Sequence, residues 1–203
     1  MKNWYRIPWM LFIVLALAAE SAFCQIEKKT EEMVTDFKDR EQLSEWQIIN
    51  DGVMGGVSSS EIVIGARSVA VFQGYVSLEN NGGFASVRLK PRELDLGEYA
   101  GISVRVRGDG RTYQFRLGTN DAFDGISYRV SFKTQKDVWE VHYFPFPDFK
   151  PTYRGRYVEN ANPLAREKIQ QVGVLIADKR EGPFLLEIDW IKGYREGNSE
   201  CSD

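Results

Sequence analysis

Apolar and polar residues alternate along most of the chain, the period of strands that bury one face and leave the other in water. The alternating runs lie at 84–89, 102–107, 113–117, 128–133, 139–143 and 184–191. Two runs rich in β-forming residues, 69–72 and 75–78, and the almost continuously apolar run 172–177 complete the pattern. The run 172–177 predicts a central strand, because an apolar residue at every position requires burial on both faces.

About ten short strands separated by Gly, Pro, Asn and Asp predict an all-β fold, a β-sandwich with jelly-roll connections. One or two short helices are expected, a turn around 40–43 and a helix at 162–171. The alternation also assigns faces. It sets His142 on the wet side of its strand, opposite Tyr143, and it sets Trp190 opposite Ile191.

Four segments divide the chain. Residues 1–24 are predicted to be an export signal, because Lys2 and Arg6 precede an apolar core of about 11 residues, too short for a spanning helix of about 20. Residues 25–36 are predicted to be a charged spacer, 37–194 the β-sandwich binding domain and 195–203 a disordered tail. We therefore expect an exported protein, either periplasmic or secreted.

Charge and cysteine content narrow the classes of partner. The 203 residues carry a net charge of −3 and no block of Lys or Arg, so a nucleic-acid partner is excluded. Cleavage after Cys24 would leave Cys201 as the only cysteine, and no internal disulfide could form. Membrane association is expected only if Cys24 is lipidated.

Glycines flank a short apolar pair in the segment 50–58. Because glycine reaches positive φ without a steric penalty, the segment predicts a tight, irregular loop. Val53 and Met54 could form an adaptable apolar tip for a protein partner, since Met repacks readily. Alternatively, Met54 tucks beneath the sandwich while Asp51 caps backbone N–H groups.

A set of motifs follows in order along the domain. They are Asp51-Gly52-Val53-Met54-Gly55-Gly56, Phe72-Gln73-Gly74, Asn80-Asn81-Gly82-Gly83-Phe84-Ala85, Gly108-Asp109-Gly110-Arg111 with Tyr113, Trp139, Pro145-Phe146, and Asp178-Lys179-Arg180-Glu181-Gly182-Pro183-Phe184. The Gly-Asp-Gly at 108–110 lacks the strand-to-helix setting of a phosphate loop and predicts a hairpin turn.

From about Phe37 to Tyr194, this ordered set resembles the complex I intermediate-associated protein 30 family. The resemblance implies a galactose-binding-domain-like jelly roll and a non-enzymatic role. Family members in mitochondria assist the assembly of respiratory complex I, and the wider fold group includes carbohydrate-binding modules.

Catalytic and metal-binding patterns are weak in the sequence. His142 is the only histidine, and no nucleophile motif surrounds any serine, although Ser131 on a neighbouring strand could approach His142. One His and one terminal Cys do not make a zinc site, and carboxylates are plentiful without a distinguished pair. We therefore expect no enzyme, no metal and no cofactor.

Arginines recur on the predicted wet faces of consecutive strands. Arg105, Arg107, Arg116, Arg129 and His142 would form one polar surface if those strands shared a sheet. Such a surface could bind an anionic or hydroxyl-rich ligand, because a guanidinium matches carboxylates and stacks on flat rings. It could equally be an ordinary solvated face with Arg–Glu pairs.

The leading expectation is a non-catalytic binding protein, an assembly factor or chaperone-like accessory protein with a protein partner. The alternative is a carbohydrate-binding module of the cell envelope. The candidate binding residues are Asp51, Val53, Met54, Arg105, Arg107, Arg116, Arg129 and His142.

Overall fold

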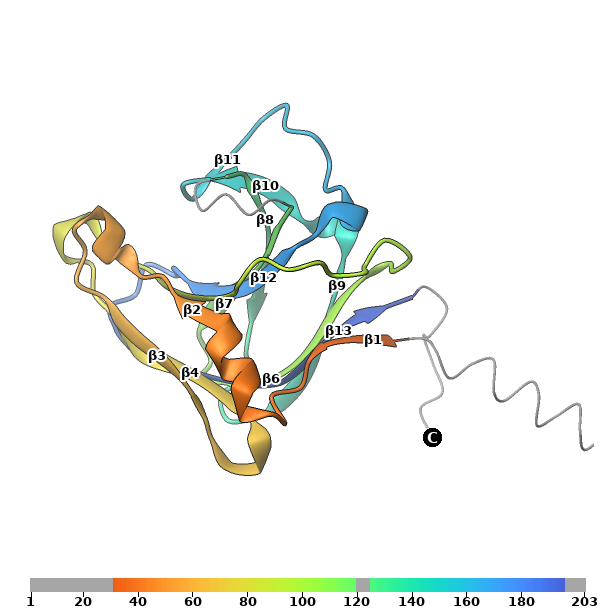
Figure 1. Cartoon of the computed structure of the whole chain (residues 1–203). Helices are drawn as coiled ribbons and strands as arrows, with labels where there is room; N and C mark the ends of the chain where they lie inside the picture. Colours follow the sequence, from red (N-terminus) through yellow and green to blue (C-terminus); the bar gives the residue numbers. More distant parts are fainter. Residues whose placement is uncertain (1–30, 120–124, 196–203) are drawn as a thin grey trace, which may run out of the picture. The chain divides into compact units, whose positions relative to one another are not determined.

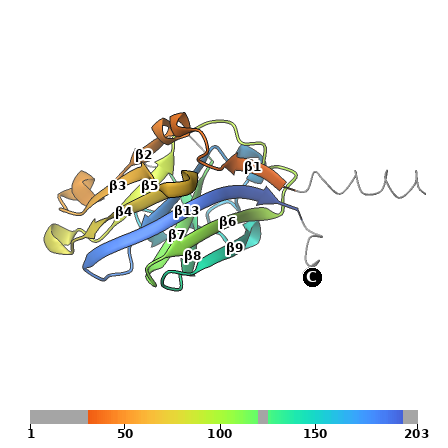
Figure 2. The ribbon, with the colours of Figure 1, turned by 90° about the horizontal axis from the view of Figure 1, so that it is seen from below.

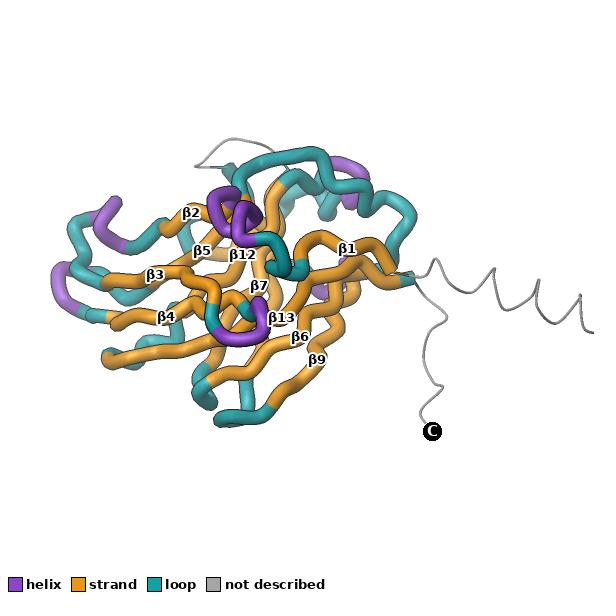
Figure 3. The backbone as a smooth tube through the Cα atoms, turned by 60° about the horizontal axis from the view of Figure 1, so that its bottom comes forward, coloured by secondary structure: helices purple, strands orange, loops and turns teal. Residues whose placement is uncertain are grey.

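The computed structural model describes residues 31–119 and 125–195, which fold as two antiparallel β-sheets packed face to face (Figures 1 and 2). The predicted all-β sandwich is confirmed. Within the described ranges, helical structure is confined to short 3-10 turns at strand ends (Figure 3).

The first sheet, sheet A, has the strand order β3-β4-β13-β6-β9, and β1 also pairs with β13. Its strands are β1 (Glu31–Thr35), β3 (Ser59–Ile64), β4 (Ala70–Val76), β6 (Gly101–Gly108), β9 (Trp139–Pro145) and β13 (Gly182–Tyr194). β13 is long enough for β4 and β1 to pair with different parts of the same strand while β6 pairs with its other edge.

The second sheet, sheet B, has the strand order β11-β10-β8-β7-β12-β5-β2. Its strands are β2 (Trp46–Ile48), β5 (Ala85–Leu89), β7 (Thr112–Gly118), β8 (Ser127–Lys133), β10 (Lys150–Tyr153), β11 (Arg156–Tyr157) and β12 (Gln171–Ile176). β12 lies inside this sheet between β7 and β5, as its continuous apolar sequence predicted.

The 3-10 turns are η1 (Arg40–Glu45), η2 (Asp51–Met54), η3 (Ala66–Ser68), η4 (Glu79–Asn81), η5 (Phe146–Asp148) and η6 (Arg166–Lys168). The predicted turn near 40–43 is η1. The predicted helix at 162–171 is wrong: only η6 forms there, and the chain then runs on to bury Ile169 before β12 begins.

The core lies between the sheets, where the inward residues of both are almost fully buried. Phe115 of sheet B packs against Phe144 of sheet A, with ring centroids 5.5 Å apart. Phe72 and Phe184 pack at 4.9 Å on neighbouring strands of sheet A. Burial of each such ring stabilises the fold by roughly 1.5–3 kcal/mol.

Two boundary predictions need correction. Residues 31–35, assigned to the spacer, form β1, because Val34 and Thr35 are buried against β13. The Gly108–Arg111 segment is no hairpin, since it carries the chain from β6 in sheet A to β7 in sheet B. The predicted signal and disordered tail, residue 195 excepted, lie outside the described residues.

Two face assignments were also wrong. A bulge at Asp189 shifts the register of β13 against β6, so Ile191, and not Trp190, continues the inward face. In β9 the phase is reversed: Val141 and Tyr143 are exposed, while Phe144 is buried. The reason is that Phe144 fills the space between Phe115 and Phe132.

No helix among residues 31–119 and 125–195 is both long and apolar enough to cross a membrane.

Candidate functional site

The outer face of sheet B, the face turned away from the core, carries a row of basic residues. Cross-strand pairing places Arg129 of β8 opposite Arg116 of β7, Arg116 opposite Gly173 of β12, and Gly173 opposite Arg88 of β5. These side chains point outward because their sequence neighbours Val87, Phe115 and others point into the core. Three guanidinium groups therefore follow one line across four adjacent strands.

The row forms the floor of a cavity of about 670 Å³, called here the sheet-B cavity. Its described lining includes five basic residues, Arg88, Arg116, Arg129, Arg154 and Lys179, and no Asp or Glu. Val53, Met54 and Ile126 contribute apolar surface. A chain with a net charge of −3 thus concentrates positive charge in one concave place.

Few partners among the described residues satisfy the two central arginines. Arg116 donates from Nη2 to Gln114 Oε1 at 3.1 Å, and Arg129 lies over the Tyr157 ring at 4.5 Å. Neither pairs with a carboxylate of the described residues, and the Nε atoms of both are buried without a hydrogen-bond acceptor there. Burial, then the charges of Arg88 and Arg129, lower the pKa of Arg116 to about 10. Burial also lowers the pKa of Arg88.

One wall of the cavity is held by the buried carboxylate of Asp51. It accepts hydrogen bonds from Ser58 N at 2.9 Å, Ser58 Oγ at 2.5 Å, Gly83 N at 2.7 Å and Phe84 N at 3.2 Å. Burial alone would raise the pKa of Asp51, but these donors outweigh it and lower the pKa. This Asp51 anchor ties the loop of Val53 and Met54 to the loop before β5.

Two glycines leave room for that carboxylate. A Cβ at Gly82 would lie 2.6 Å from Asp51 Oδ2, and a Cβ at Gly56 would overlap the same carboxyl group. Gly56 and Gly82 therefore serve close packing around Asp51, whereas Gly55 and Gly83 adopt the positive φ that favours glycine.

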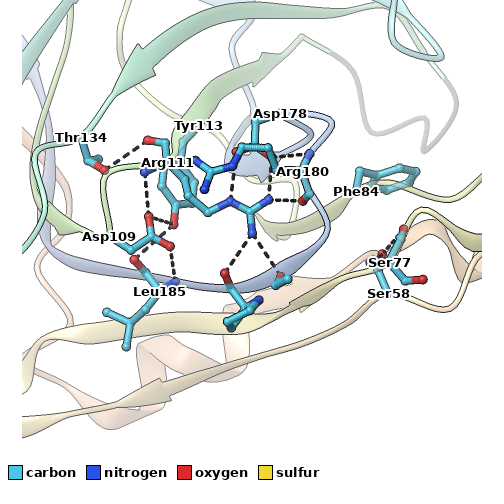
Figure 4. A network of polar contacts seen from close by, with 12 residues as sticks. Ser58, Ser77, Phe84, Asp109, Arg111, Tyr113, Thr134, Asp178, Arg180 and Leu185 are labelled. Carbon is cyan, nitrogen blue, oxygen red and sulfur yellow. Dashed lines mark hydrogen bonds and ion pairs between the residues drawn. The ribbon is translucent and has the colours of Figure 1, made fainter.

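A second buried network holds the loop that carries Lys179 (Figure 4). Arg111 donates from Nη2 to Asp178 Oδ1 at 2.6 Å and from Nε to Asp178 Oδ2 at 3.0 Å. It also donates to the carbonyl oxygens of Arg180, Gly182 and Pro183. Burial alone would raise the pKa of Asp178, but the bonds and charge of Arg111 lower it. We call this set the Arg111 anchor.

Asp109 extends the network below Arg111. Its carboxylate accepts from Arg111 N at 3.0 Å, Tyr113 Oη at 3.1 Å and Leu185 N at 3.0 Å. Burial first, and then the nearby charge of Asp109, raises the pKa of Tyr113. The Gly-Asp-Gly-Arg motif is thus a structural crossover between sheets.

The sequence matches one family model, described as Complex I intermediate-associated protein 30, over residues 35–188. The chain belongs to this family. It is 28% identical over 182 residues to the Drosophila melanogaster mitochondrial protein of that name, covering 79% of this chain and 62% of that one. The mouse protein of that name is 28% identical over 180 residues, with 78% and 55% covered. The chain therefore spans less than two thirds of the length of these curated relatives.

An uncharacterised protein of Schizosaccharomyces pombe is 32% identical over 170 residues, covering 73% of this chain and 77% of that one. Among solved structures, a family 11 carbohydrate-binding module of Clostridium thermocellum in complex with a mixed-linked tetrasaccharide superposes with a TM-score of 0.63. It is 19% identical, and the match covers 82% of this chain and 96% of that one. This likeness shows the fold.

In this member of the Complex I intermediate-associated protein 30 family, the predicted polar surface is split between the two sheets. Arg105 and Arg107 lie on the outer face of sheet A, where they pair with Asp189 and Glu187 and lie over Trp139 at 4.6 and 5.3 Å. There the interpretation of an ordinary face with ion pairs holds. Arg116 and Arg129 are in the sheet-B cavity.

The predicted loop residues divide in the same way. Val53 and Met54 are 63% and 58% exposed and line the cavity, so Met54 does not tuck beneath the sandwich. Asp51 is fully buried and caps backbone N–H groups, as the alternative interpretation of this loop predicted. Of the eight candidates, the structure brings together Val53, Met54, Arg116 and Arg129.

His142 does not belong to a polar face. Its ring lies 4.9 Å from Phe132 and 6.0 Å from Phe144 on the inner side of sheet A. Burial lowers its pKa, an effect that Glu140 at 3.9 Å partly offsets. Ser131 is exposed on sheet B, so the two residues do not form a catalytic pair.

Arg88, Arg154 and Lys179 line the cavity and were missed as candidates. Arg88 could have been found, because it lies on the polar side of the alternating run 84–89. Arg154 and Lys179 lie in turns, where alternation gives no signal. No group of three His, Cys, Asp or Glu residues within the described ranges could hold a metal ion.

Proposed function

We propose that this protein is a non-catalytic binding protein that holds a segment of a protein partner in the sheet-B cavity. The observation that carries the proposal is the described lining of that cavity, with five basic residues, no acidic ones, and an exposed apolar pair at its edge. Such a surface has apolar area for contact and charge for orientation, the usual division of roles at protein interfaces.

The role we propose for it is that of an assembly factor or chaperone-like accessory protein. Its support is family membership, because several curated relatives are named for association with complex I intermediates. The test is affinity capture from the envelope fraction of the host, followed by mass spectrometry.

The matched variants are Val53→Asp/Met54→Asp at the cavity and Val141→Asp, an exposed valine on β9 of sheet A. Respiratory-chain subunits should be recovered with the wild type and with Val141→Asp, and lost with the double variant. Recovery of the same subunits with all three proteins would show that the cavity edge is not the contact surface.

A carbohydrate-binding role is the second candidate. Gln114, Gln171 and Ser127 place amide and hydroxyl groups in the cavity beside the arginines, which suits a hydroxyl-rich ligand. Retention on a polysaccharide matrix, with no specific protein captured, would favour this role over the first.

We also propose that the protein acts outside the cytoplasm, on the strength of the predicted leader. N-terminal sequencing of the protein purified from its host should begin near Gln25. An intact Met1 would contradict export by cleavage, and a lipid on Cys24 would add membrane association.

A further inference from the structure

We propose that the sheet-B cavity binds an extended acidic peptide segment, whose carboxylates pair with Arg116 and Arg129 and whose apolar side chains pack on Val53 and Met54. This inference deepens the proposed function and rests on it, since it names the chemistry of the partner segment.

The register of sheet B sets the spacing of the positive charges. Arg116 and Arg129 are direct cross-strand partners, so their Cβ atoms lie about 5 Å apart. Arg88 lies two strands from Arg116, at about 10 Å, because neighbouring strands are about 4.8 Å apart. The row spans about 15 Å, more than a single carboxylate covers, and an extended segment with two or more acidic side chains can follow it.

Gly173 keeps the middle of the row open. A Cβ there would lie 2.8 Å from the Val87 carbonyl oxygen and 3.0 Å from Arg88 Cγ. The stem of Arg88 therefore passes close to Gly173, on the side of Arg116. Any larger residue at 173 would displace the stem of Arg88 or the Val87 carbonyl group.

The electrostatics of the cavity favour an anion. Like charges at Arg88, Arg116 and Arg129 repel one another, and burial removes the water that would screen them. The buried Nε–H groups of Arg116 and Arg129 lack an acceptor among the described residues. A carboxylate supplies two acceptor oxygens in the planar geometry that a guanidinium matches.

The apolar lining favours a peptide over an acidic sugar. Sugar rings bind through flat faces that stack on aromatic rings, and Phe84 is the one aromatic residue in the described lining of the cavity. Tyr157 nearby is covered by the Arg129 guanidinium. Flexible aliphatic groups such as Val53 and Met54 instead suit the aliphatic side chains of a peptide.

The test is an NMR titration of the wild-type protein with a blocked heptapeptide that has glutamates at alternate positions flanked by leucines. Its twin has glutamine in place of each glutamate. The Arg Nε–Hε signals of Arg116 and Arg129 should shift with the acidic peptide and stay unchanged with the twin, and those of Arg105 and Arg107 should stay unchanged with both.

Arg116→Met/Arg129→Met should weaken binding of the acidic peptide at least tenfold, because each arginine contributes a charge-assisted bond worth about that factor. The matched control, Arg105→Met/Arg107→Met, alters the same residue types on sheet A and should stay within twofold. Raising NaCl from about 0.05 to 0.5 M should weaken binding in the wild type, since salt screens the charges.

Equal binding of the two peptides, or unchanged binding in the Arg116/Arg129 variant, would overturn the inference. Binding of an oligogalacturonate, but not of the acidic peptide, would overturn it in favour of an acidic polysaccharide. Peptide binding with no loss of captured subunits in Val53→Asp/Met54→Asp would leave the inference standing and reject the proposed function. Loss of those subunits in the variant, with no binding of the acidic peptide to the wild type, would overturn the inference and leave the proposed function standing.

Discussion

Arg111 and Arg116 lie five residues apart, directly before β7 and in its middle, and their side chains are used in opposite ways. Arg111 meets a carboxylate and three carbonyl oxygens in a buried network. Arg116 faces a cavity with two other arginines nearby and one described hydrogen-bond acceptor, Gln114. The first region pairs its cation with a carboxylate, whereas the described residues provide no carboxylate partner for Arg116. Residue type alone therefore does not separate the arginine of a buried network from that of a candidate binding site; the acceptors around each one do.

The largest expected effect on stability comes from a substitution in the Arg111 anchor. Arg111→Met should lower the free energy of unfolding by about 3–5 kcal/mol, because it leaves the Asp178 carboxylate buried without its cation. Urea unfolding at pH 7 measures this change. A loss below about 1 kcal/mol would mean that water replaces the guanidinium freely. Arg111 would then, like Arg116, not be needed for the stability of the fold.

Asp51 is the carboxylate counterpart of Arg111. Asp51→Asn should cost about 2–3 kcal/mol, since a neutral amide replaces a charged acceptor and turns an N–H donor toward the donors of Ser58, Gly83 and Phe84. The same unfolding assay applies, and Asp36→Asn on the exposed ion pair with Lys38 is the control. Equal losses in the two variants would show that burial of Asp51 adds nothing.

Lowering the pH should weaken the two anchors and not the cavity floor, because the anchors depend on ionised carboxylates and the floor does not. Asp51 and Asp178 have pKa values below the ordinary 3.8, so the unfolded chain binds more protons and stability is lost as pH falls through 3.8. His142, with its pKa below 6.5, adds a loss that begins near pH 6.5 for the same reason.

Urea unfolding from pH 7 to 3 should show both steps. His142→Phe should flatten the curve between pH 7 and 5 and leave the more acidic limb in place. An unchanged curve in this variant would contradict the assignment of the first step to His142.

Removing Arg116 should have a smaller effect of the opposite sign. Arg116→Met should raise the free energy of unfolding by about 0.5–2 kcal/mol, because it relieves repulsion among buried like charges in the proposed binding site. Thermal unfolding of the free protein measures it. A clear loss of stability would show that Arg116 is a structural residue like Arg111.

The smallest effect belongs to the paired surface of sheet A. Arg105→Met should change stability by no more than about 1 kcal/mol, because its ion pair with Asp189 is partly exposed. Comparison with Arg116→Met in the same assay contrasts an arginine that pairs with a carboxylate, Arg105, with one that has no carboxylate partner among the described residues. A larger loss would mean that the Arg105–Asp189 ion pair stabilises the fold more than a partly exposed pair is expected to.

Much of the fold followed from alternation, because sheets with one buried face impose it directly. Ile102, Val104 and Val106 point inward as predicted, and the apolar run 172–177 forms most of an interior strand. Alternation failed where a single residue changes phase, as at the Asp189 bulge, and where both phases hold aromatic residues, as with Tyr143 and Phe144.

The site was harder to predict, because alternation gives a face without saying to which sheet the strand belongs. Arg107 and Arg116 occupy similar positions in consecutive strands, yet the crossover at Gly108–Arg111 places them on opposite outer faces. The glycine motifs identified the family, but most of their residues build the anchors of Asp51 and Arg111 and not the binding surface itself. The exceptions are Val53, Met54, Phe84 and Lys179, which line the sheet-B cavity.

The two anchors hold two of the loops that line the cavity before any ligand arrives. Asp51 fixes the loop of Val53 and Met54, and Arg111 fixes the loop of Lys179. A ligand therefore immobilises little of these two loops when it binds, and for them the loss of conformational entropy is small. Free and bound forms should superpose closely, and a stiffened ligand should gain affinity over a flexible one of the same sequence.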